Sequence, residues 1–463
     1  MREVITGKRC SRDPAVLLVT YHFPPVNTVG VHRPVALARH LFEKNWQVTV
    51  LTARPNERQR CDPLLAWGLE SRIRVVRTPS PDLPAIAAGI LKGRRRTQRQ
   101  APSRKADQAQ QPASDRPPSM LRRFVDWASW WLHVPDSVSG WFVPAVGAGL
   151  REIRKRRPDV LFATGPPWTA LVVGATLSFV TGVPLVADFR DPWHGSPWHP
   201  IPYAAHRAFR GWLEARVVRI ARRITCAWEG IERLMRERYP RRGRHIATVL
   251  NGFDVDKMDA IAPSRRNGDC CTLIHIGNFY MHRSPEPLFD GLRRVRDRHP
   301  EARGRLRVAL VGGERYGNRP LADLADAYGV ADMVRCVGPR PHRESLGMLK
   351  GADAALLFGQ SGSKALASVP GKVYEYIGAG KPVLAVGAGE EALQIMRRGG
   401  CRVWAVPADA PDSLADALRS ILADYRRGTL RCRGDETLRY EFSQARMAEH
   451  LESTLRQAMT PRR

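Results

Sequence analysis

Residues 15–52 read AVLLVTYHFPPVNTVGVHRPVALARHLFEKNWQVTVLT. Two continuous apolar runs, Ala15–Tyr21 and Trp46–Thr52, have the length that is typical of buried parallel strands. Between them, a loop leads into a segment from Val31 to Phe42 in which apolar residues recur at helical spacing. This strand–loop–helix–strand unit predicts an α/β fold with a doubly wound parallel sheet.

The same alternation continues to the end of the chain, and it restarts after a polar gap, which places a boundary near residues 252–271. We therefore expect two Rossmann-like halves, residues 1–252 and 253–440, facing each other across a cleft, and a closing amphipathic helix over 441–463. Further strands are expected at 72–78, 159–164, 184–188, 224–228, 245–250, 272–276, 306–311, 333–337, 354–358, 383–386 and 403–406.

The charge balance narrows the choice of partners. The chain has 463 residues with 74 Lys and Arg against 45 Asp and Glu, a formal net charge of +29. Such a surface attracts anionic lipid, nucleic acid or phosphorylated substrates, although a coding bias toward Arg explains part of the excess equally well. The composition excludes a disordered chain, and eight cysteines without a CxxC pair exclude a zinc ribbon and fit a reducing cytoplasm.

Four segments bear on where the protein is located in the cell. No targeting segment is expected, because the first residues are polar. The uncharged stretch 165–187 contains Pro and Gly, so we interpret it as buried α/β core rather than a membrane span. Residues 80–119 are predicted to be a basic disordered insertion. The helix that follows, with Trp127 and Trp131 on one face, either lies on an anionic membrane surface or packs on the first half.

Two loops in the first half follow predicted strands and carry polar or flexible residues. In the first loop, Gly30 would let the backbone approach a ligand closely where a helix begins. The alternative is that this loop is an ordinary connection between a strand and a helix. Asp188, Arg190 and Asp191 form a charged cluster after an apolar strand, where a carboxylate could orient a hydroxyl or act as a base. The alternative is a salt-bridged helix start.

The second half has two comparable segments. Gly277 follows a predicted strand, and Arg283 precedes a helix, where a cation can bind a diphosphate. Near residue 370, Gly371 opens a helix with Lys372 in its first turn and Glu375 one turn later. Lys can neutralise a phosphate while Glu accepts hydrogen bonds from ribose hydroxyls, or the two form a surface ion pair.

These segments together resemble the family 4 glycosyltransferases, retaining enzymes with the GT-B fold. The resemblance covers nearly the whole chain except the insertion. The sequences TGPP and ADFRDPW are similar to those of bacterial family members that take part in polysaccharide synthesis. The matching segments, in order, are YHFPP, VHRPVALARHL, WQVTVLT, PDVLFATGPP, VPLVADFRDPW, VLNGFD, HIGNFYMHRSPEPLF and KVYEYIGAGKPVLA.

The resemblance implies a nucleotide-sugar donor held by the carboxyl-terminal half and a hydroxyl acceptor, a lipid-linked glycan, held by the amino-terminal half. Glu375 would bind the ribose, with Lys372 and Arg283 on the diphosphate. Gly277 and the segment Gly338–Arg340 would contact diphosphate or base through the backbone, with Gly30 near the donor phosphate or sugar. No metal and no cofactor are expected. The Asp254-x-Asp256 pair follows a strand and turn in the linker, so it is not interpreted as a metal site.

The chain departs from the family at three positions. Ala367 stands where a Glu commonly precedes Glu375 by eight residues, Arg190 stands where many members have His, and the first loop lacks the usual Gly-Gly. Three alternatives remain: a nucleotide-sugar epimerase of the same architecture, a transferase-like protein without turnover, and a nucleic-acid-binding protein. No nucleic acid is expected as a partner, because the chain lacks a helix-turn-helix, zinc or RNP motif.

Overall fold

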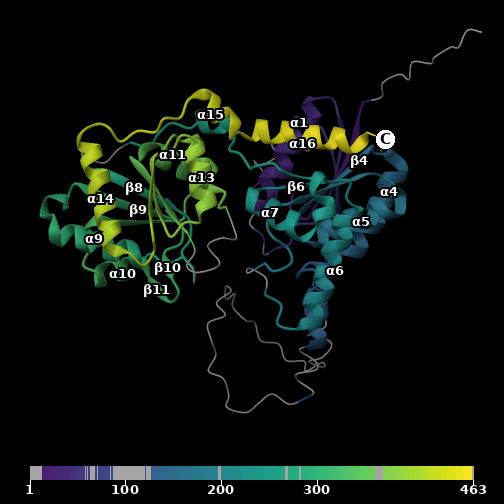
Figure 1. Ribbon diagram of the computed structural model, residues 1–463, viewed down its shortest axis with the longest axis horizontal. Helices are drawn as coiled ribbons and strands as arrows, with labels where there is room; N and C mark the ends of the chain where they lie inside the picture. The colour runs from purple at the N-terminus through teal and green to yellow at the C-terminus, as the bar shows by residue number, and fades with distance from the viewer. Residues whose placement is uncertain are drawn as a thin grey trace, which may run out of the picture. The chain divides into compact units, whose positions relative to one another are not determined.

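The computed structural model describes residues 13–460 except 58, 60, 63–67, 70, 84, 87–119, 121–126, 197–199, 266–269, 281–282 and 360–368. Contacts divide the chain into two compact units: unit 1 comprises Met1–Ile224 with Thr454–Arg463, and unit 2 comprises Thr225–Ser453. Most of the basic insertion expected at 80–119, and Ala367, lie outside the described residues. Each unit is built around a parallel sheet (Figure 1).

The first sheet has seven strands in the order β3-β2-β1-β4-β5-β6-β7. Strands β1 and β4 are neighbours, so the chain reverses its direction of progress across the sheet between them, with Val16 opposite Val160. At such a switch point the loops at the carboxyl ends diverge and leave room for a ligand. The strands are β1 Ala15–Thr20, β2 Gln47–Ala53, β3 Arg74–Thr78, β4 Val160–Gly165, β5 Leu185–Phe189, β6 Arg223–Cys226 and β7 Ile246–Thr248.

Helices cover this sheet because their inward faces are apolar. In α1 (His32–Glu43), Leu37, Ala38 and Leu41 are fully buried against the strands. Helices α4 (Phe142–Arg156), α5 (Thr169–Thr181) and α6 (Ala204–Ile220) are successive neighbours on unit 1 (Figure 1).

The second sheet has six strands in the order β12-β9-β8-β13-β14-β15, which again reverses direction in the middle, between β8 and β13. The strands are β8 Cys271–Ile276, β9 Leu306–Val311, β12 Val334–Gly338, β13 Ala354–Phe358, β14 Val383–Val386 and β15 Val403–Val406. Its helices include α8 Val255–Asp259, α9 Glu286–Arg298, α10 Leu321–Ala327, α11 His342–Gly351, α12 Lys372–Gly378, α13 Glu390–Arg398, α14 Pro411–Arg426 and α15 Glu436–Glu441.

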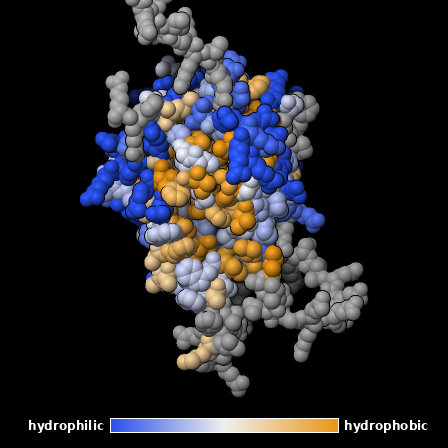
Figure 2. All heavy atoms as spheres, turned by 90° about the vertical axis from the view of Figure 1, so that its right-hand side faces the viewer, coloured by the Kyte–Doolittle hydropathy of each residue, from blue (hydrophilic) through white to orange (hydrophobic). Residues whose placement is uncertain are grey.

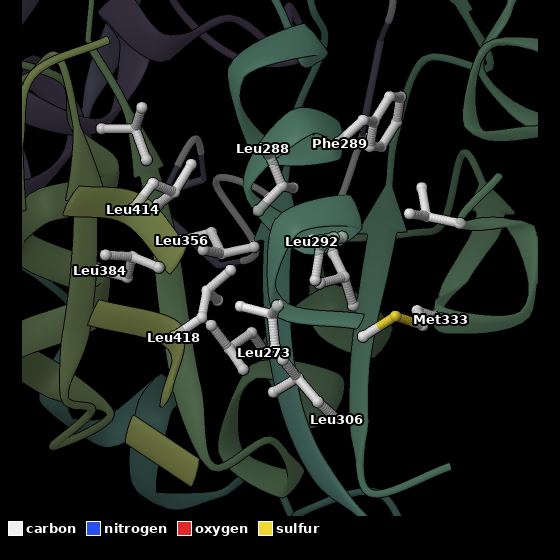
Figure 3. Packing of buried hydrophobic residues seen from close by; sticks show 14 of the residues in the cluster. Leu273, Leu288, Phe289, Leu292, Leu306, Met333, Leu356, Leu384, Leu414 and Leu418 are labelled. Carbon is white, nitrogen blue, oxygen red and sulfur yellow. The ribbon is translucent and has the colours of Figure 1, made fainter. Parts of the chain in front are cut away.

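Alternate residues of these strands enter two separate cores, as the two-residue period of a strand requires. Leu273 and Leu356 contact α9 and α14 on one face, whereas Ile274 and Leu357 contact the helices of the other face. In Figure 3, Leu288 and Leu292 of α9 lie among the leucines of the strands and of α14.

The predicted strands and the expected parallel α/β architecture are confirmed, with end points that differ by at most two residues. The helix expected at the end is α16 (Gln444–Met459), and its Met447, Leu451 and Leu455 are buried. No helix among the described residues is long and apolar enough to span a membrane.

The interpretation of 165–187 as buried core is only partly right. Its strands and the inner face of α5 are buried, but Phe179 and Val180 are 71% and 60% exposed. The segment is uncharged on both sides of the helix, and tertiary packing covers only one of them.

Candidate functional site

Gly277 directly follows β8 and has a φ of +141°, a conformation that residues with a Cβ rarely adopt. Its backbone N–H donates a hydrogen bond of 2.7 Å to the Val311 carbonyl. A Cβ at this position would collide with Nζ of Lys372, from the first turn of α12. Gly277 therefore provides the space that Lys372 occupies.

Two cations converge beside Gly277. Burial, and then the nearby Arg283, lower the pKa of Lys372 to about 8, while Glu375 opposes the shift. The Arg283 guanidinium lies 5.3 Å from the centre of the Tyr280 ring. Its Nε is buried and has no hydrogen-bond partner among the described residues. The predicted cluster of Arg283, Lys372 and Glu375 thus comes together at the carboxyl edge of the second sheet, with more positive than negative charge.

His275 was not predicted as a site residue, and it lies buried next to this cluster. Its Nδ1 faces the Leu356 carbonyl at 3.1 Å, so Nδ1 carries the proton and Nε2 is an acceptor. Burial, and then Lys372, hold the pKa of His275 well below its usual value. The ring is therefore neutral and adds no charge to the site, and its Nε2 has no partner among the described residues.

Glu375 is already oriented by a second histidine that the sequence did not indicate. Oε1 of Glu375 and Nε2 of His342 are 2.8 Å apart, and Nδ1 of His342 lies 3.1 Å from Nζ of Lys257. The three residues come from α12, α11 and α8. This chain of contacts fixes one carboxylate oxygen and leaves the group part-exposed for a ligand.

Glycines shape the neighbouring loops. After β9, the Gly313 N–H donates a hydrogen bond of 2.8 Å to Oδ1 of Asn278. Gly338, which ends β12, has a φ of +77° and a hypothetical Cβ there would lie 2.6 Å from Oε1 of Glu314. Arg340 follows as an exposed side chain, and Gly371 directly precedes α12. The predicted backbone contacts at Gly277, Arg340 and Gly371 remain predictions.

In unit 1, Asp188 is completely buried and already paired. It accepts hydrogen bonds from Nε and Nη2 of Arg33, at 3.0 and 2.8 Å, and from the Thr164 hydroxyl at 2.7 Å. Arg33 is itself only 3% exposed. Because the two charges neutralise each other away from water, Asp188 has the geometry of a residue that holds β4, β5 and α1 together.

Arg190 joins the loops after β1 and β4 to its own. Its Nη1 donates to the Gly30 carbonyl at 2.5 Å, and its Nη2 donates to the Pro166 carbonyl. A Cβ on Gly30 would lie 2.7 Å from Nη1 of Arg190, so glycine is required for this close approach. Burial lowers the pKa of Arg190, and the neighbouring carboxylates oppose that shift.

Asp191 is the member of this cluster that remains accessible. Its side chain is part-exposed, and burial raises its pKa to about 6, with Arg190 acting in the opposite direction. His22, two residues after β1, is also near Arg190, and burial, followed by Arg190, lowers the pKa of His22 to about 4. At neutral pH the edge therefore presents a carboxylate with a raised pKa and a neutral imidazole, as groups that accept or position protons require.

The Asp254 and Asp256 pair has a structural role at its first member. Oδ1 of Asp254 accepts a hydrogen bond of 3.0 Å from the Lys257 N–H and so caps α8.

The sequence analysis did not assign a role to four residues at the carboxyl edges of the two sheets: Arg33, His22, His275 and His342. His22 and His275 stand in or beside loops that follow apolar strands, which is the signal that could have found them, whereas Arg33 and His342 pair with residues remote in sequence.

Two family models match the chain. The model described as "Glycosyltransferase Family 4" matches residues 110–257, and "Glycosyl transferases group 1" matches residues 270–424. A D-inositol 3-phosphate glycosyltransferase of Nocardiopsis dassonvillei is 26% identical over 61% of this chain and 67% of its own length. A protein of the same name from Thermobifida fusca is 28% identical, over 39% of this chain and 42% of its own length.

Solved structures agree in fold. HepE of Anabaena, solved in complex with UDP, superposes with a TM-score of 0.60 at 15% identity and covers 96% of this chain and 100% of its own. A glycosyltransferase from Rickettsia africae gives a TM-score of 0.63 at 13% identity, with 98% and 100% coverage. A UDP-N-acetylglucosamine 2-epimerase gives 0.52 at 11% identity, with 95% coverage of both chains, so the architecture alone does not separate transfer from epimerisation.

Proposed function

Because this chain belongs to the family 4 glycosyltransferases of GT-B fold, we propose that it transfers a sugar from a nucleotide-sugar donor to a hydroxyl acceptor with retention of configuration. The observation that carries the donor assignment is the excess positive charge beside Gly277, where Lys372 and Arg283 have no hydrogen-bonded anionic partner among the described residues. Both side chains are half-buried, so their charges are poorly solvated, and a diphosphate would compensate for the lost solvation.

The donor half of the reaction is assigned to unit 2. When the bond between the anomeric carbon and the diphosphate oxygen breaks, the leaving diphosphate takes the electron pair. Lys372 and Arg283 would stabilise this developing charge without a metal ion. Glu375, held by His342, would accept hydrogen bonds from the ribose hydroxyls. The UDP bound to HepE supports a nucleotide ligand for this fold.

The acceptor half is assigned to unit 1. Asp191 would orient the acceptor hydroxyl or take its proton, because its raised pKa is closer to neutrality than that of an ordinary carboxylate. Asp188, which is fully paired with Arg33 and Thr164, would position the loop that carries Arg190 and Asp191. We propose a lipid-linked glycan of surface polysaccharide synthesis as acceptor and the inner face of the plasma membrane as location.

Calorimetry with UDP, GDP and UDP-glucose tests the donor site. We expect Lys372→Ala to weaken binding of the preferred nucleotide about tenfold or more, because each hydrogen bond to a charged group contributes about 1.5–3 kcal/mol. Arg335→Ala, an exposed position on β12, is the matched control and should bind normally. Unchanged binding by Lys372→Ala and Glu375→Gln would show that the donor site lies elsewhere.

Product analysis distinguishes sugar transfer from epimerisation and identifies the class of acceptor. The relatives' name suggests a phosphorylated polyol as a second acceptor class, so inositol 3-phosphate belongs in the acceptor panel with lipid-linked glycans. Transfer that keeps the donor's anomeric configuration, seen by NMR, supports the proposal. Turnover of the donor without any acceptor would instead indicate an epimerase.

A further inference from the structure

The outer face of α5 is apolar, which is unusual for a helix on the surface. Phe179 and Val180 are 71% and 60% exposed, and no residue of the helix carries a charge. Neighbouring α6 adds Phe209 and Trp212, the latter 53% exposed. Figure 2 views the side of the molecule that carries α4, α5 and α6 and shows a hydrophobic area bordered by hydrophilic residues. Contiguous apolar surface of this kind marks an interaction site.

The aromatic side chains on α6 continue toward the tryptophans that the sequence singled out. Phe209 stacks on Trp212 with ring centres 5.4 Å apart, and on its other side it contacts Trp131 at 5.5 Å. The Arg216 guanidinium lies 5.6 Å from the Trp212 ring. Tryptophan beside arginine is the combination that suits the headgroup level of a bilayer, where the ring is partly buried and the cation meets a phosphate.

The exposed charges of these three helices all have one sign. Helices α4 and α6 contain one acidic residue each, Glu152 and Glu214, and both are buried. The exposed charged side chains of α4, α5 and α6 are therefore all basic. They are Arg151, Arg154, Lys155 and Arg156 on α4 and Arg207, Arg216 and Arg219 on α6.

We propose that the face formed by α4, α5 and α6 docks on a bilayer that contains anionic phospholipid. Phe179, Val180 and Trp212 would enter the boundary between headgroups and acyl chains, and the basic residues would contact lipid phosphates. The proposal extends the proposed function, because it places unit 1, to which we assign the acceptor, at the surface where a lipid-linked acceptor resides.

The same charges disfavour the other occupants. In a twofold dimer the identical faces would bring the basic residues of α4 and α6 against their own copies. The chain's segment 92–105 carries seven basic residues and no acidic one, so it is repelled by this face as well. An anionic lipid surface would accept the apolar side chains among its acyl chains and pair the basic side chains with its phosphates.

Vesicle co-sedimentation of the full chain tests the proposal. We expect tighter binding to vesicles of phosphatidylcholine with phosphatidylglycerol than to phosphatidylcholine alone, and weaker binding as salt rises. Phe179→Ser with Trp212→Ser should reduce the affinity at least tenfold, and Arg216→Glu with Arg219→Glu should abolish the preference for phosphatidylglycerol. Tyr440→Ser and Arg335→Glu, exposed positions in unit 2, are the controls.

Calorimetry with UDP on the same variants separates this proposal from the donor assignment, since neither pair of substitutions touches unit 2. Retained UDP binding with lost vesicle binding supports the docking face. Equal binding of wild type and both variant pairs to the anionic vesicles would overturn it. It would also be overturned by a wild-type dimer that Phe179→Ser with Trp212→Ser converts to a monomer, which would show that a second copy covers the face.

Discussion

The carboxyl edges of the two sheets differ in what their buried charges contact. In unit 1, Asp188 accepts three hydrogen bonds from Arg33 and Thr164, and Arg190 donates to two backbone carbonyls. In unit 2, Lys372 and Arg283 lie close together, and Glu375 is the carboxylate that opposes them. At the first edge Arg33 neutralises the buried Asp188, whereas the second edge has positive charge that an anion would neutralise. This difference supports our proposal that unit 2 binds the diphosphate.

The largest effect on stability is expected when the buried ion pair of Arg33 and Asp188 is broken. Arg33→Met leaves the buried Asp188 carboxylate without its cation, which should lower the free energy of unfolding by about 3–5 kcal/mol. Lys372→Met removes a poorly solvated ammonium from unit 2 and should change stability by less than about 1 kcal/mol. Urea denaturation measures both, and similar losses for the two variants would contradict the comparison.

A large effect on turnover is expected at Asp191. Since burial raises its pKa to about 6, the ionised form that can accept a proton predominates above pH 6 and is lost as the pH falls through that value. Wild-type kcat/KM should therefore decline below about pH 6, and Asp191→Asn should lower it about 100-fold and remove that decline. UDP binding serves as the control and should stay normal. A variant with the wild-type pH profile would exclude Asp191 as the base.

Nucleotide affinity should depend on pH through Lys372. Its pKa of about 8 means that the ammonium is present below pH 8 and is lost as the pH rises above it. We expect the Kd for UDP to be constant up to about pH 8 and then to rise about tenfold per pH unit, until the higher pKa of the complex is reached. Lys372→Arg keeps its charge and should bind without this dependence. An unchanged slope in that variant would assign the titration to another group.

The smallest effect is expected at His342, which contacts Glu375 and is placed in neither the diphosphate nor the acceptor site. His342→Phe should weaken UDP binding about threefold, whereas Glu375→Gln should weaken it about tenfold, because a hydrogen bond to a charged group contributes about 1.5 kcal/mol or more. Nucleotides that lack a ribose hydroxyl test whether Glu375 acts through the ribose. Both variants should lose less affinity for 2′- or 3′-deoxy-UDP, and equal losses for all three nucleotides would place Glu375 away from the ribose.

Most strands could be predicted because each is a short apolar run that is buried on both faces of a parallel sheet. Strands β9, β13, β14 and β15 have the predicted bounds. The site residues of unit 2 could be predicted as a group for a related reason, since loops after parallel strands meet at one edge. Lys372 and Gly277 were both singled out, but nothing local indicated that the amine occupies the space of the missing Cβ.

Unit 1 was harder to predict because its important contacts join distant residues. Asp188 looked like a reactive carboxylate next to Arg190, and its partner Arg33 lies in the first helix. Whether a carboxylate is structural or reactive depends on its burial, and the neighbouring residues in the sequence do not indicate how buried it is. Asp191, three residues after Asp188, is part-exposed.

The sequence by itself determined the two parallel sheets, the order of their elements and the residue types at their carboxyl edges, because strand burial and loop position follow from local hydrophobic pattern. Only the tertiary structure decided which charges are neutralised and which side of α5 is covered. Pairing and exposure depend on what other segments bring to the same place, so Arg33 neutralises Asp188 while Phe179 and Val180 stay uncovered.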